Sequence, residues 1–119
     1  MAKSDTKKQR SAEIEIRWKD QVPEAVYFQG NGYCIVAKVE SGQYMLTRYG
    51  WDEDPAKGES LVVSPKDTVK LMDSLRVKRP DTLIRSLGRR FALKEPHNAF
   101  VKIKTSLERR GIPYEILSV

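Results

Sequence analysis

The chain has 119 residues and a mass of 13.7 kDa, which suits one domain and is too short for two ordinary ones. Charged residues make up 32% of the sequence, hydrophobic residues 39%, and the mean hydropathy is -0.56, values that exclude a largely disordered chain. No apolar run approaches the roughly 20 residues that cross a bilayer, and the amino terminus lacks the apolar stretch of a signal peptide. We therefore expect a soluble, cytoplasmic protein with no membrane partner.

The basic excess is unevenly distributed along the chain. Residues 1–12 carry four basic and one acidic side chain, residues 13–64 carry five and nine, and residues 65–119 carry thirteen and six. The overall net charge of +6 therefore comes from the amino-terminal tail and the carboxy-terminal half. Such segregation favours a surface that meets phosphates or an acidic protein partner.

Cysteine and histidine are too scarce for the common catalytic and metal sites. A single cysteine, Cys34, excludes an internal disulfide framework, and a single histidine, His97, excludes the usual zinc clusters. Cys34 has apolar neighbours and is expected to fill space, and His97 is expected to belong to a helix cap region. We predict no catalytic residues, no metal ligands and no cofactor.

The amino-terminal region divides into an arm and the start of a sheet. Residues 1–12 are polar and basic, and we expect a flexible arm, followed by a single α+β domain over residues 13–119. Residues 13–18 alternate polar and apolar, which predicts a strand with Ile14, Ile16 and Trp18 on one face. Because this strand would lie at an exposed edge of the sheet, it permits dimerisation by strand addition. A dimer is therefore possible, and the sequence does not determine the oligomeric state.

Further strands are predicted at residues 25–28, 33–39, 44–49 and 60–63. Residues 20–24, which contain Pro23, are expected to be a connection. The segment Gly30-Asn31-Gly32 supplies the positive backbone angles of a tight hairpin turn, and Ser41-Gly42 supplies those of a second one. These signals predict an antiparallel meander.

At Ser64 the apolar period changes from two to 3.6. Ser64 suits an N-cap, Pro65 the first helical position and Asp67 the first turn, so a helix is predicted to begin here. The apolar side of this helix is predicted to comprise Val69, Leu71, Met72 and Leu75.

Two more helices and a strand complete the pattern. A second helix is predicted over residues 81–93, with Leu83, Ile84, Leu87 and Phe91 on one stripe. A third helix is predicted over residues 98–110, with Phe100, Ile103 and Leu107 facing inward. Gly111 is predicted to end this helix in the left-handed backbone conformation. Residues 114–117 are expected to return to the sheet. The predicted fold class is α+β: an N-terminal antiparallel β-meander of four to five strands, three short helices and a terminal strand.

The strongest candidate site is a basic stretch in the helical half. Arg85 and Arg89 are four residues apart and so share one helix face, with the hydroxyls of Thr82 and Ser86 nearby. Guanidinium groups, small hydroxyls and a helix amino terminus at Pro80-Asp81 form a combination that suits phosphates. The predicted nucleic-acid-binding residues are Arg76, Lys78, Arg79, Arg85, Arg89, Arg90, Lys94, Lys102 and Lys104. Arg109 and Arg110 could extend this surface.

These residues predict a non-enzymatic nucleic-acid-binding protein, for DNA rather than RNA. The second and third helices resemble a helix-turn-helix in spacing, and residues 107–112 resemble the end of a winged-helix recognition helix, although most strands precede the helices here. A second docking mode would stack exposed bases on aromatic residues of the strands. Those aromatic residues are Trp18, Tyr27, Phe28, Tyr33, Tyr44, Tyr49 and Trp51.

Two alternatives from other classes remain open. The same positive surface would suit a small inhibitor or accessory factor that docks an acidic protein partner. A metal-dependent nuclease is the weaker alternative, since it requires carboxylates of neighbouring strands to converge beside a lysine. The residues concerned are Glu13, Glu15, Lys38 and Glu40. An ion site in the acidic loop would use Asp52, Glu53, Asp54 and Glu59.

Overall fold

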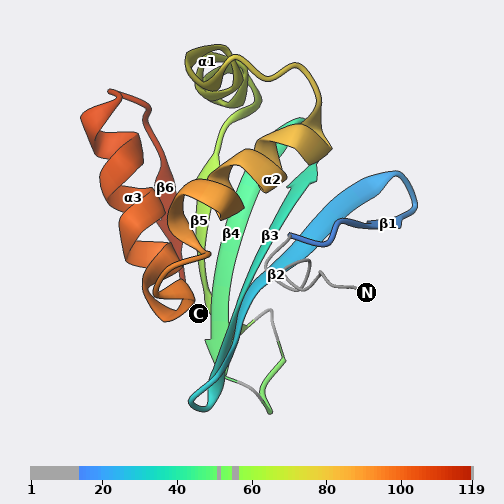
Figure 1. The fold of residues 1–119 in the computed structure, drawn as a ribbon, viewed down its shortest axis with the longest axis vertical. Helices are drawn as coiled ribbons and strands as arrows, with labels where there is room; N and C mark the ends of the chain where they lie inside the picture. The colour runs from blue at the N-terminus through green and yellow to red at the C-terminus, as the bar shows by residue number, and fades with distance from the viewer. Residues whose placement is uncertain (1–13, 51, 55–56, 119) are drawn as a thin grey trace, which may run out of the picture.

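The fold is known from a computed structural model, which describes residues 14–50, 52–54 and 57–118. Six antiparallel strands form one sheet in the order of the chain, and three α-helices cover one of its faces (Figure 1). The strands are β1 (Arg17–Lys19), β2 (Val22–Gly30), β3 (Tyr33–Glu40), β4 (Gln43–Gly50), β5 (Glu59–Val63) and β6 (Glu115–Leu117). The helices are α1 (Pro65–Leu75), α2 (Pro80–Phe91) and α3 (Ala99–Arg109), with a short 3-10 helix η3 (Pro96–Asn98) before α3. This arrangement confirms the predicted α+β class; the predicted arm lies outside the described residues.

Three two-residue turns build the meander. Both central residues have positive φ in the turn Asn31-Gly32 (52° and 85°) and in the turn Ser41-Gly42 (54° and 79°), as the hairpin type requires. The turn Asp20-Gln21 has the same geometry (52° and 67°), although it contains no glycine. The sequence therefore identified two hairpins and missed the one between β1 and β2.

The predicted connection around Pro23 is wrong, because Pro23 lies inside β2 opposite Trp18 of β1. Pairing of β2 with β3 begins only at Glu24, so the missing N–H of Pro23 interrupts no bond of that ladder. The predicted first strand is also displaced. β1 begins at Arg17; Ile14 precedes it and is buried in the core, whereas Trp18 is 52% exposed.

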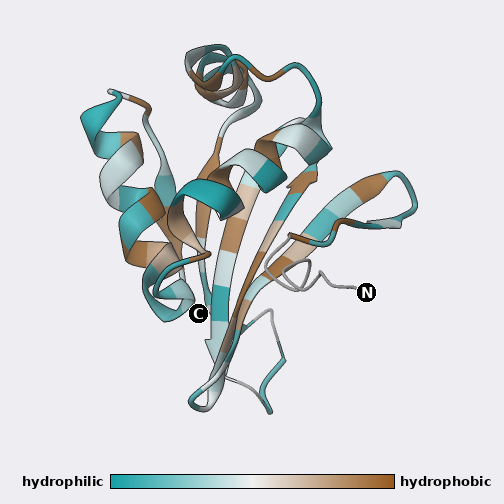
Figure 2. Cartoon of the chain, viewed as in Figure 1, coloured by the Kyte–Doolittle hydropathy of each residue, from teal (hydrophilic) through white to brown (hydrophobic). Residues whose placement is uncertain are grey.

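Alternation along the strands gives the sheet one buried face, which appears in Figure 2 as hydrophobic bands between hydrophilic ones. The largest fully buried side chains of the strands are Ile35, Tyr44, Leu46, Leu61 and Val63. The helices contribute Leu71, Leu83, Ile84, Leu87, Ile103 and Leu107 to the same core. The core therefore lies between the helices and the sheet. No helix of the described residues covers the opposite sheet face, here called the bare face.

The start of α1 matches its sequence signals. Ser64 Oγ accepts a hydrogen bond from the backbone N–H of Asp67 at 3.2 Å, and Pro65 occupies the first turn. The predicted inward position of Val69 is wrong, since this side chain is 57% exposed. Thr68 is buried instead, because its hydroxyl donates to the carbonyl of Val63 (3.1 Å) and accepts from the N–H of Tyr44 (3.1 Å).

The end of the chain returns to the sheet as predicted. Gly111 follows α3 with a φ of 69°, which is the left-handed conformation expected at a helix end. β6 then pairs antiparallel with β5, and Leu61 lies opposite Ile116. Of the helices in the described part of the chain, none is both long and apolar enough to cross a membrane.

Candidate nucleic-acid interface

The outer side of α2 gathers the central residues of the predicted site. Leu83 and Leu87 are buried against the sheet, while Arg89 and Arg90 are exposed and Arg85 is half-exposed. An open hollow of about 360 Å³ lies on this side and is lined by Val77, Thr82, Arg85, Ser86, Arg89 and Arg90. The structure thus brings the three arginines and the two hydroxyls together on one surface, here called the α2 hollow.

Two carboxylates near the α2 hollow in sequence are engaged by other cations. Asp81 Oδ1 accepts from Arg79 Nε at 3.0 Å, and Glu95 Oε1 lies 3.0 Å from Lys102 Nζ. These contacts lower the pKa of both carboxyls below their usual values, mainly through the hydrogen bonds from Arg79 and Lys102. Over the described ranges, no carboxylate pairs with Arg85, so its charge is available to an outside anion.

The helix amino terminus expected at Pro80-Asp81 carries a carboxylate of its own, because Asp81 lies in the first turn of α2. The hydrogen bond from Arg79 and, to a smaller extent, the backbone N–H groups of Asp81 and Thr82 lower the pKa of this carboxyl. The N–H of Leu83 donates to the carbonyl of Arg79 at 3.0 Å, as the first regular bond of the helix. Because an anionic side chain already lies at this helix end, we expect a phosphate on this surface to bind to side chains.

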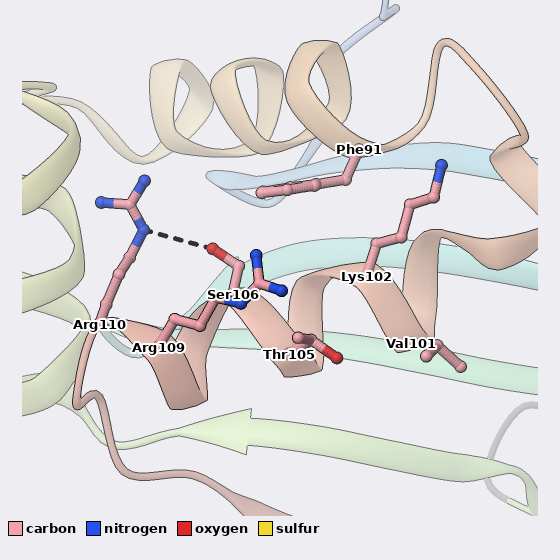
Figure 3. Close-up of a pocket in the computed structure, with 7 residues that line it drawn as sticks. All are labelled: Phe91, Val101, Lys102, Thr105, Ser106, Arg109 and Arg110. Carbon is pink, nitrogen blue, oxygen red and sulfur yellow. Dashed lines mark hydrogen bonds between the residues drawn. The ribbon is translucent and has the colours of Figure 1, made fainter.

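A second depression, the α2–α3 groove, lies between these two helices and has a volume of about 480 Å³ (Figure 3). It is lined by Phe91, Val101, Lys102, Thr105, Ser106, Arg109 and Arg110. Arg110 Nε donates to Ser106 Oγ at 3.3 Å, and its Nη1 donates to Ser74 Oγ of α1 at 3.2 Å. Sequence reasoning assigned Phe91 only to the core stripe and did not identify this groove, since it arises from the packing of α3 beside α2.

The remaining predicted site residues are spread over the helical layer. Arg76, Lys78 and Arg79 are exposed on the connection between α1 and α2. Lys94 is exposed after α2, and its carbonyl accepts from Lys102 Nζ at 3.2 Å. Lys104 lies on α3 and lines neither the α2 hollow nor the α2–α3 groove. The prediction therefore named one compact group, in the α2 hollow, and several separate cations.

The sheet offers few of the aromatic rings expected for base stacking. Tyr27 and Tyr44 are buried in the core, and Trp51 lies outside the described residues. The Tyr33 hydroxyl donates to the carbonyl of His97 at 2.9 Å, and its ring packs against Phe28 with centroids 5.0 Å apart. These contacts engage Phe28 and Tyr33, whereas Trp18 on the edge strand β1 is 52% exposed. Most of the expected aromatic residues are therefore not freely exposed on the sheet, which weakens it as a docking surface.

The metal sites considered from the sequence do not assemble in the described part of the chain, and Glu13 lies outside it. Lys38 forms an ion pair with Glu40 (3.1 Å), and Arg48 forms one with Glu59 (2.6 Å). Glu53 accepts from the N–H of Gly50 at 3.1 Å and so closes its own loop. Across residues 14–50, 52–54 and 57–118, no three histidine, cysteine or acidic side chains lie close enough together to hold a metal ion.

Comparison with known proteins gives no direct guide to function: no family model, curated protein or solved structure matches this chain. The resemblance to winged-helix proteins finds no support in the topology either, because five strands precede the helices and only β6 follows α3. Function must therefore be inferred from the arrangement of the residues themselves.

Proposed function

We propose that the chain is a non-enzymatic nucleic-acid-binding protein whose helical layer contacts the phosphates of DNA. The observation that carries this proposal is the α2 hollow, where Arg85, Arg89 and Arg90 meet the hydroxyls of Thr82 and Ser86. Guanidinium groups bind phosphate oxygens in a bidentate way, and hydroxyls add further hydrogen bonds to the same group.

The charge balance of the surrounding surface supports an anionic ligand. Residues 65–119, which include all three helices, carry thirteen basic and six acidic side chains. The basic arm adds Lys3, Lys7, Lys8 and Arg10, which would raise the affinity in a salt-dependent way. Since phosphates and cations dominate such an interface, weak sequence preference is expected.

The shape of α2 favours DNA over RNA. Its 12 residues present an exposed helical side, and an α-helix fits the wide major groove of B-form DNA. The deep and narrow major groove of A-form RNA does not admit side chains in the same way. A DNA duplex should accordingly compete better than an RNA duplex of the same sequence.

Replacing Arg85 and Arg89 together by alanine tests the proposal. We expect weaker binding to random-sequence duplex DNA and a salt dependence reduced by roughly one or two phosphate equivalents. Fluorescence anisotropy titrations at several salt concentrations measure both quantities. The matched control is the variant Arg17→Ala/Lys19→Ala, which removes the same charge from exposed positions of β1 and should change affinity less than about twofold. A helical variant that binds as tightly as the wild type at every salt concentration would overturn the proposal.

A protein partner is the second candidate, and two exposed apolar side chains favour it. Leu93 is 44% exposed after α2, and Val101 is 53% exposed on α3, both close to basic residues. An acidic partner with apolar anchors would complement such a surface. Binding to random-sequence duplex DNA at low salt distinguishes the two candidates. A protein that binds phosphates should show about micromolar affinity, whereas a protein that binds only a protein partner should show no binding.

A further inference from the structure

The α2–α3 groove differs in chemistry from the α2 hollow because it combines cations with an aromatic ring. Figure 3 shows the Phe91 ring edge-on at the α2 side of the groove, with one ring face turned toward α3. Val101 lies at one end and is 53% exposed. Phosphate binding does not require these apolar surfaces, so they point to a ligand that has a flat apolar part as well as a charge.

The charge of the groove is concentrated at the opposite end. Lys102 Nζ lies 3.0 Å from Glu95 Oε1, so its charge is largely balanced. Arg110 is held by the neutral hydroxyls of Ser106 and Ser74, and Arg109 is exposed. No carboxylate pairs with either arginine in the part of the chain that the structure describes, so this end retains positive charge for an anion.

We propose that the α2–α3 groove binds one unpaired nucleotide of a DNA strand, with its base against Phe91 and its phosphate on Arg109 and Arg110. This inference deepens, and rests on, the proposed DNA-binding function. In a duplex the bases are stacked on one another and cannot reach the ring of Phe91, so only an unpaired base fits. The volume of about 480 Å³ is in the range of sites for small ligands.

The two depressions lie on either side of neighbouring residues of α2, since Arg90 lines the hollow and Phe91 lines the groove. A duplex held at the α2 hollow would therefore place an adjoining single strand close to the groove. The expected substrate class is thus a DNA duplex with an unpaired end, and its affinity should exceed that of a blunt duplex.

The experiment compares three DNA ligands with the full chain. They are a blunt duplex, the same duplex with a short thymidine tail, and the same duplex with an equally long tail that lacks bases. We expect the thymidine tail to raise affinity about tenfold over the blunt duplex, and the abasic tail to give a clearly smaller rise, because only the first provides a base to stack. Fluorescence anisotropy measures all three dissociation constants.

Two variants locate this effect in the groove. Phe91→Leu keeps an apolar side chain for packing and removes the ring, so the advantage of the thymidine tail over the abasic tail should disappear while blunt-duplex binding stays within about twofold of wild type. Arg109→Ala should lower the affinity for both tailed ligands, whereas Arg17→Ala, at an exposed position of β1 outside the groove, should not. Urea unfolding confirms that each variant is folded.

The outcomes separate this inference from the proposed function. If the blunt duplex binds but the two tails give equal affinities, or if Phe91→Leu keeps the thymidine advantage, the nucleotide site is wrong and phosphate binding at the α2 hollow stands. If no DNA ligand binds, both proposals fail together.

Discussion

At the scale of single residues, two buried tyrosines fix the position of the candidate interface. A β-bulge between Val26 and Phe28 leaves Tyr27 without a partner on β3, and its side chain enters the core. The Tyr27 hydroxyl donates to the carbonyl of Ile84 at 2.6 Å and accepts from the Tyr44 hydroxyl at 3.4 Å. Since Ile84 precedes Arg85, this bond holds α2 at the point where the α2 hollow begins.

Burial raises the pKa of both phenols well above the usual value, so both remain protonated and able to donate at neutral pH. Their roles in the network differ, however. Tyr27 donates to α2 and accepts from Tyr44, whereas Tyr44 only donates. Removing one hydroxyl therefore has a different consequence from removing the other.

Tyr27→Phe should destabilise the fold by about 1–2 kcal/mol, because it removes the bond to Ile84 and leaves the Tyr44 hydroxyl without its acceptor. Tyr44→Phe is the matched control and should cost less than about 1 kcal/mol, since the bond from Tyr27 to α2 survives. Urea unfolding monitored by circular dichroism gives both free energies. Equal costs for the two variants would contradict this account.

At the scale of elements, the local signals in the sequence were sufficient for most of the fold. Ser64 and Pro65 define the start of α1 by their own chemistry, and the glycine turns define two hairpins. Thr68 was missed because a buried hydroxyl that bonds to two strands cannot be recognised from a polarity pattern. β1 was misplaced because its register depends on a turn that contains no glycine.

The candidate site was predictable to a similar extent. The spacing of Arg85 and Arg89 alone places them on one side of a helix. The α2–α3 groove depends instead on how two helices pack, and Phe91 looks like an ordinary core residue in a single helix pattern. The helix pattern also places Asp81 in the first turn of α2, but it does not show that this carboxylate pairs with Arg79.

The contact between the amino-terminal segment and α2 depends on a glycine. A Cβ added at Gly88 would lie 2.7 Å from Ile14 Cγ1, which is too close, and 3.0 Å from Tyr27 Cε1, which is a tight contact. Gly88 therefore allows Ile14 and β2 to approach the helix, and this approach determines how α2 lies on the sheet. Neither residue signals this contact in the sequence, because they are far apart along the chain.

Gly88→Ala should destabilise the protein by about 1–3 kcal/mol, because crowding against Ile14 exceeds the gain of up to about 1 kcal/mol in helix propensity. Ile14→Ala alone should also destabilise, since it removes buried methyl groups. In the double variant the added methyl has room. The double variant should therefore be destabilised by about 1 kcal/mol less than the sum of the two single variants. Strict additivity in urea unfolding would contradict the proposed contact.

At the scale of the whole molecule, the two faces of the sheet differ in cover and in charge. Helices cover one face, and residues 65–119, which contain these helices, carry thirteen of the 22 basic residues. The bare face has a depression of about 450 Å³ in which Arg17 and Lys38 are accompanied by Glu24 and by apolar and hydroxyl side chains. Because cations and an anion alternate there, the bare face offers a polyanion much less attraction than the helices do.

This asymmetry predicts where DNA leaves its footprint. When a random-sequence duplex is added to the isotopically labelled full chain, backbone amide shifts should change along α2 and α3, around Arg85 and Arg109, and stay unchanged at Val36 and Thr47 on the bare sheet face. The reason is that cations without carboxylate partners lie on the helical side, whereas Val36 and Thr47 adjoin the mixed charges of the depression. Shifts confined to Val36, Thr47 and their neighbours would instead place the nucleic acid on the sheet, and the arginines of α2 would then serve only as a solvated surface.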